Sequence, residues 1–110
     1  MTDASTLHTA MSTMTDFAIK YFTNLNRDLD FAVDPDAQNI RQTSNKIGVL
    51  TNPETERSVH VYVESGKNDD YYIIIDFQGT FLMQTSIAID DSMGNHFKLN
   101  EALHPVFRLL

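Results

Sequence analysis

The sequence predicts one α+β domain over residues 1–110, with a four-stranded antiparallel β-sheet and a C-terminal helix packed on one face. The chain length is close to that of a single domain, and no Pro- or Gly-rich linker divides it. Short segments of alternating apolar residues are separated by turn residues, which is typical of antiparallel strands. The last residues instead have helical spacing.

The N-terminal segment carries two overlapping patterns. A spacing of three and four, which favours an amphipathic helix, links Leu7, Met11, Met14, Ala18, Tyr21 and Leu25. Phe17, Ile19 and Tyr21 also alternate, as do Leu29, Phe31 and Val33, and alternation favours a strand. Helix and strand both stay open for residues 17–25. We expect a short N-terminal helix before about residue 15, followed by a long bent strand.

The middle of the chain predicts strands joined by turns. The turn signals DPD at 34–36 and NPETE at 52–56 enclose a polar strand at 39–51. Residues 58–64, SVHVYVE, alternate cleanly, and SGKNDD at 65–70 turns the chain into the next strand. That strand starts at Tyr71 and is expected to continue to Met83 or beyond.

The stretch YYIIIDFQGTF at 71–81 is apolar on two sides. Alternation places Tyr71, Ile73, Ile75 and Phe77 toward the core, and Tyr72, Ile74, Asp76 and Gln78 on the other side. We expect Asp76 at the solvated end of that second side. Gly79 predicts a bend or bulge that turns Phe81 toward its cover.

The C-terminal part predicts one further strand segment and the helix. SIAID at 86–90 alternates, and DSMGNHF at 91–97 is expected to be a loop. The helix is predicted from Asn100, a candidate N-cap, although a start near Leu103 would place Pro105 in the first turn.

Charge and composition narrow the classes of partner. Fifteen acidic and eight basic residues give a net charge of −7, which argues against binding to nucleic acid or to an anionic membrane. The chain has no cysteine, no apolar run long enough to span a membrane and no secretory signal. We expect a cytoplasmic protein.

The sequence holds no pattern that predicts catalysis. Its four histidines are scattered, no metal-ligand spacing or glycine-rich phosphate loop is present, and no nucleophile elbow surrounds a serine. We therefore expect no enzyme activity, no metal site and no cofactor.

Large apolar side chains are numerous for a thin sheet with one short helix. A surplus of this kind predicts either a homo-oligomer interface or a surface that binds apolar segments of other proteins.

Two segments resemble the SecB-type export chaperones. DFQGTF at 76–81 followed by LHPVFRLL at 103–110 is similar to the end of the family's last strand and the start of its first long helix, and residues 17–35 resemble its first strand. The resemblance implies a four-stranded antiparallel sheet with a helix packed on it, which assembles into dimers or a dimer of dimers and binds unfolded polypeptides without ATP. The client-binding residues expected on this basis are Tyr72, Ile74, Phe77, Phe81 and Met83.

The sequence also departs from the family. Its second helix and acidic tail have no counterpart here, so we expect a homodimer rather than a tetramer, and a reduced relative of the kind that a phage encodes. Of the acidic surface that binds the export motor only Asp28 is matched, while Ala32 and Ile74 stand where the family carries other acids, which argues against docking to the motor.

Three function classes follow in order of preference. The first is an ATP-independent SecB-like chaperone or protein-binding module. The second is a small acidic adaptor or inhibitor that binds one dedicated partner, for example a phage protein acting on a host enzyme or in virion assembly. A catalytic or metal role comes third.

Overall fold

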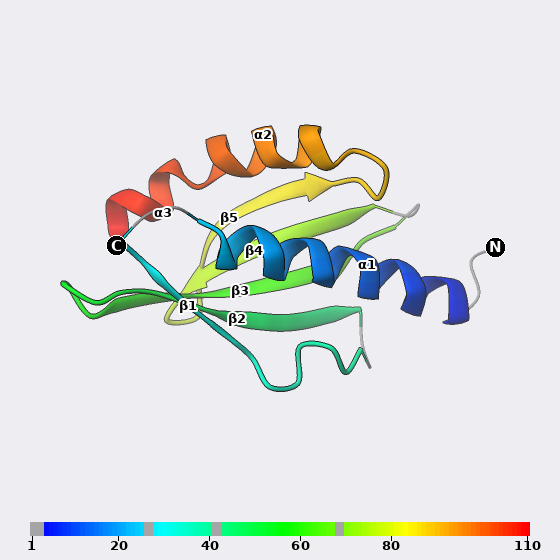
Figure 1. Cartoon of the computed structure of the whole chain (residues 1–110), viewed down its shortest axis with the longest axis horizontal. Helices are drawn as coiled ribbons and strands as arrows, with labels where there is room; N and C mark the ends of the chain where they lie inside the picture. The colour runs from blue at the N-terminus through cyan, green and yellow to red at the C-terminus, as the bar shows by residue number, and fades with distance from the viewer. Residues whose placement is uncertain (1–3, 26–27, 41–42, 68–69) are drawn as a thin grey trace.

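The computed structural model describes residues 4–25, 28–40, 43–67 and 70–110. Three helices and five strands follow one another along the chain (Figure 1). Their bounds are α1 (Ala4–Thr23), β1 (Asp30–Val33), β2 (Ser44–Asn52), β3 (Arg57–Ser65), β4 (Tyr71–Phe77), β5 (Thr80–Ile87), α2 (Ser92–Ala102) and α3 (His104–Leu109). The α+β class, the antiparallel sheet and the C-terminal helix are confirmed.

The sheet is an antiparallel meander in the order β1-β2-β3-β4-β5, so each strand pairs with the next one in the chain. In Figure 1, α1 crosses in front of the strands and α2 runs along β5. Buried side chains of the helices and of one sheet face form a single hydrophobic cluster. One face of the sheet is therefore covered by helices, and we call the opposite one the open face.

The prediction of a long bent strand after residue 15 is wrong, because α1 continues to Thr23. Met11, Met14, Ala18 and Phe22 are nearly or fully buried, and their spacing of three and four forms one stripe along α1. Two further apolar residues, Phe17 and Ile19, lie beside that stripe and are partly buried. They produce the alternation that resembled a strand. Only β1 remains as a strand in this region.

The number of strands, predicted as four, is five because the strand expected to run from Tyr71 to Met83 is a hairpin. Gln78 and Gly79 have φ values of 52° and 83°. Two consecutive residues with positive φ form the tight turn that reverses a chain between antiparallel strands. Gly79 therefore marks a turn between β4 and β5 rather than a bend within one strand.

The other strand predictions agree better with the structure. The strand expected at 58–64 is confirmed as β3, and the one expected at 39–51 is β2, which begins later, at Ser44. Residues 41–42 of that prediction lie outside the described part. The last strand, β5, ends at Ile87, whereas alternation suggested residue 90.

The predicted loop at 91–97 is wrong, because these residues form the start of α2. The N-cap is Asp91, whose Oδ1 accepts a hydrogen bond from the Gly94 backbone N–H at 3.0 Å, while the expected cap Asn100 lies inside the helix. Helical periodicity did not reveal α2 because its apolar residues point in two directions. Pro105 does lie in the first turn of α3, as the alternative start predicted.

The C-terminal helix α3 is anchored to the turn between β2 and β3. The Leu110 carbonyl accepts hydrogen bonds from Asn52 Nδ2 at 2.9 Å and from Thr55 Oγ1 at 3.0 Å. The guanidinium of Arg57 donates to the Leu109 carbonyl at 2.9 Å. These bonds fix α3 at the end of the sheet, where it continues the line of α2.

Candidate functional site

The five residues predicted to bind a client lie on different sides of the sheet. Tyr72 and Ile74 are half-buried on the open face, and Phe81 is 60% exposed. Phe77 packs against the core from the covered side, and Met83 is buried in that core. The structure thus brings three of the five to the open face.

A β-bulge separates Phe81 from Met83. Phe81 pairs with Asp76 and Met83 pairs with Ile75, so Leu82 is one extra residue in β5. Alternation alone places residues 81 and 83 on the same face, but the extra residue shifts that pattern. Met83 therefore joins Ile75 in the core.

A polar cluster lies at the centre of the open face. The His60 Nδ1 is 3.6 Å from the Asp76 Oδ1, and these two residues face each other across β3 and β4. The Asp76 Oδ1 is buried and accepts no hydrogen bond from the described residues, so Asp76 is not at a solvated end as expected. Burial raises the pKa of Tyr62, and the hydrogen bond and negative charge of Asp76 raise that pKa further.

This cluster does not supply a metal centre. Within the described ranges, no group of three histidine, cysteine, aspartate or glutamate side chains converges on one point. The described helices also offer no segment that combines the length and the apolar composition of a membrane span.

A groove runs between α1 and the pair α2 and α3, and it encloses a cavity of about 620 Å³. Its floor is apolar and consists of Phe17, Tyr21, Leu25 and Phe107, which are buried or half-buried. Its rim consists of exposed polar side chains, namely Lys20, Asn24, Ser92, His96, Asn100 and His104. We call this feature the interhelix groove.

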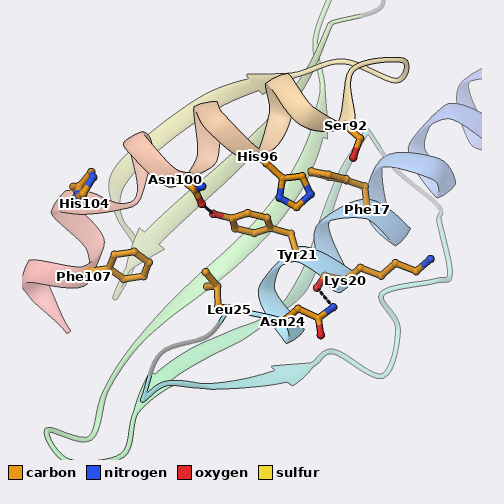
Figure 2. Close-up of a pocket in the computed structure, with 10 residues that line it drawn as sticks. All are labelled: Phe17, Lys20, Tyr21, Asn24, Leu25, Ser92, His96, Asn100, His104 and Phe107. Atoms are coloured by element: carbon orange, nitrogen blue, oxygen red, sulfur yellow. Dashed lines mark hydrogen bonds between the residues drawn. The ribbon is translucent and has the colours of Figure 1, made fainter.

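Contacts between α1 and α2 hold the walls of the interhelix groove. The Tyr21 hydroxyl donates a hydrogen bond to the Asn100 Oδ1 at 2.5 Å. Figure 2 shows both residues reaching toward each other, with His96 above Tyr21 and beside Phe17. The His96 ring lies 5.4 Å from the Phe17 ring, nearly edge-on, and 5.3 Å from the Tyr21 ring.

The outer side of α2 exposes two large apolar side chains, Met93 and Phe97. They are 74% and 68% exposed and lie one helical turn apart. We call this pair the α2 ridge. A hollow of about 460 Å³ lies beside the ridge, and its other lining residues, Ser92, His96 and Asn100, also line the interhelix groove.

The α2 ridge is absent from the predicted binding residues because the sequence pattern predicts a loop at 91–97. Two signals were present. Asp91 before Ser92 is a helix N-cap pattern, and Met93 with Phe97 and Leu99 with Leu103 form two apolar pairs, each at a spacing of four. These pairs lie on different sides of one helix, which obscures a single amphipathic stripe.

Comparison with known protein families, curated proteins and solved structures gave no match.

Proposed function

We propose that this protein is an ATP-independent protein-binding module that holds apolar segments of other polypeptides, and that the α2 ridge is its main contact surface. The observation that carries the proposal is the exposure of Met93 and Phe97 on a helix whose opposite side is already anchored in the core. Burying a side chain of this size contributes about 1.5–3 kcal/mol, so a partner that covers both gains substantial affinity.

The chemistry of the α2 ridge suits varied apolar partners. A methionine side chain is flexible and polarisable, so it adapts to different shapes, and an exposed phenylalanine provides a flat anchor. Asp90 and Glu101, near the two ends of α2, are exposed, and the chain carries a net charge of −7. An apolar segment flanked by basic residues fits this surface best.

A SecB-like chaperone is the specific form of the proposal. It is supported by an antiparallel sheet with C-terminal helices on one face, and by Tyr72, Ile74 and Phe81 on the open face as a second apolar area. The fifth strand and the long helix α1 are features that the sequence resemblance did not imply.

Suppression of aggregation tests the chaperone activity. Light scattering by reduced insulin B chain should fall at a near-stoichiometric ratio of the protein. The double variant Met93→Ser with Phe97→Ser should lose most of this effect, whereas Val33→Ser, which removes an exposed apolar side chain of the edge strand β1 outside both apolar areas, should retain it. No suppression at several-fold excess would contradict a chaperone.

A dedicated adaptor is the second candidate, and the compactness of the α2 ridge favours it. Two large side chains on one helical turn form a small patch that suits one complementary partner. Capture from a lysate should then yield one protein in a stable complex, and the double ridge variant should lose it. A chaperone would instead retain many proteins weakly.

Self-association must be separated from both candidates. The native mass measured by light scattering should be a multiple of 12.5 kDa if copies associate. A dimer that becomes a monomer in the double ridge variant would show that a second copy covers the ridge, and it would overturn the assignment of the ridge to other proteins.

A further inference from the structure

We propose that the interhelix groove is a binding site for a small amphipathic anion, namely a flat apolar molecule that carries one carboxylate. This site is distinct from the α2 ridge, and its occupant is a small molecule rather than a polypeptide.

The volume and floor of the groove fit the apolar part of such a ligand. A cavity of about 620 Å³ lies within the range of small-molecule sites, which are mostly apolar with a few polar groups that orient the ligand. Phe17, Tyr21 and Phe107 provide three aromatic rings on the floor, and Leu25 completes it. Three aromatic rings on the floor favour a flat ligand, because ring faces and edges can both pack against it.

The lining of the groove lacks the acidic side chains that dominate the molecule as a whole. The chain has fifteen acidic and eight basic residues, yet the groove lining contains Lys20, His96 and His104 and no aspartate or glutamate. Asp91 and Glu101 each adjoin a rim residue in sequence but lie outside the lining, and Asp91 is occupied in the N-cap of α2. An anion therefore meets one lysine, two imidazoles and no carboxylate in this lining, although the protein as a whole repels anions.

The rim also carries hydrogen-bond donors that have no partner among the described residues. The Oδ1 of Asn100 accepts the Tyr21 hydroxyl, which leaves its Nδ2 free to donate toward a ligand. The Nζ of Lys20 and the ring nitrogens of His96 and His104 have no hydrogen bond or ion pair with the described residues either. A group with several acceptor lone pairs complements this set, and a carboxylate offers about four.

The contacts that shape the groove also preorganise it. His96 is fixed against the rings of Phe17 and Tyr21, and the hydrogen bond from Tyr21 sets the orientation of the Asn100 amide. A ligand then finds the rim side chains already placed, as Figure 2 shows, so less entropy is lost on binding.

The experiment compares an anionic and a neutral probe that share the same aromatic ring system, 1-naphthoate and 1-naphthylmethanol. Each is titrated into the labelled full chain, and dissociation constants are measured from NMR chemical-shift changes. We expect naphthoate to bind about tenfold more tightly, because charge-assisted hydrogen bonds require its carboxylate. The signals of Phe17, Tyr21 and Phe107 should shift.

Variants distinguish the contribution of the rim residues to probe binding from that of other basic residues and of the α2 ridge. The exposed double change Lys20→Gln with His104→Gln should weaken naphthoate about tenfold and naphthylmethanol less than about twofold. Lys98→Gln, on α2 but outside the groove lining, should leave both unchanged, as should Met93→Ser with Phe97→Ser. Equal binding of the two probes, shifts confined to the ridge, unaltered naphthoate binding in the rim variant, or no binding at millimolar probe would each overturn the proposal.

Discussion

The two long helices lie on the same face of the sheet but are held there in different ways. α1 buries an apolar stripe that includes Met11, Met14 and Phe22. α2 buries only Asn95 and Leu99 within its bounds, and it exposes two large apolar side chains, Met93 and Phe97. α1 is thus attached by hydrophobic burial, whereas directed hydrogen bonds contribute much of the attachment of α2. This leaves the apolar residues of α2 available for other contacts.

The largest expected effect contrasts one phenylalanine from each helix. Phe22→Ala in α1 should lower the free energy of unfolding by about 3–5 kcal/mol, because the side chain is only 2% exposed and its removal leaves a cavity. Phe97→Ala in α2 should change it by less than about 0.5 kcal/mol, since the side chain is 68% exposed. Urea denaturation followed by circular dichroism measures both values. Equal losses would show that α2 is also attached through its outer side.

The next prediction concerns the hydrogen bonds that attach α2. The buried Asn95 side chain accepts from the Ala88 N–H at 2.8 Å and donates to the Ala88 carbonyl at 2.7 Å. Asn95→Ala removes the partner of the Ala88 N–H and leaves the Ala88 carbonyl with only its longer bond from the Asp91 N–H at 3.4 Å, so it should cost about 2 kcal/mol of stability. Hydrogen exchange at the Ala88 amide should become faster in the same variant.

A matched asparagine controls for this change. Asn24 is exposed and donates only to the nearby Lys20 carbonyl at 2.9 Å, so Asn24→Ala should have little effect. A loss in Asn24→Ala as large as that in Asn95→Ala would contradict a special role for the bonds to Ala88.

The sequence predicted the parts of the fold that depend on local alternation. Val59, Val61 and Val63 were placed on one face of a strand, and all three are fully buried. Tyr71 and Ile73 were likewise placed toward the core, and both are buried. In these strands successive side chains point to opposite faces. The buried face can therefore be predicted from the strand's own sequence, without knowing its partner strand.

The other parts of the fold and of the candidate sites depend on features that alternation along one strand does not determine. The extra residue Leu82 moves Met83 to the core, and a bulge of this kind follows from pairing with β4 rather than from β5 alone. The interhelix groove requires Tyr21 and Asn100 to meet across 79 residues. The α2 ridge was locally readable, but its two apolar pairs point in different directions and do not resemble an ordinary surface helix.

The smallest expected effect tests how firmly the two helices are joined. Tyr21→Phe removes the hydroxyl that donates to the Asn100 Oδ1 but retains the buried ring. We expect a loss of about 0.5–1 kcal/mol, because Asn100 is exposed and water can replace the lost donor. A double-mutant cycle with Asn100→Ala should assign most of that loss to the Tyr21–Asn100 pair.

The same variant should bind the naphthoate probe almost normally. Since the floor of the interhelix groove stays aromatic, naphthoate binding should weaken less than about threefold. A loss of stability above about 2 kcal/mol would instead show that this bond, rather than the Asn95 amide, is the main attachment of α2 to the rest of the domain.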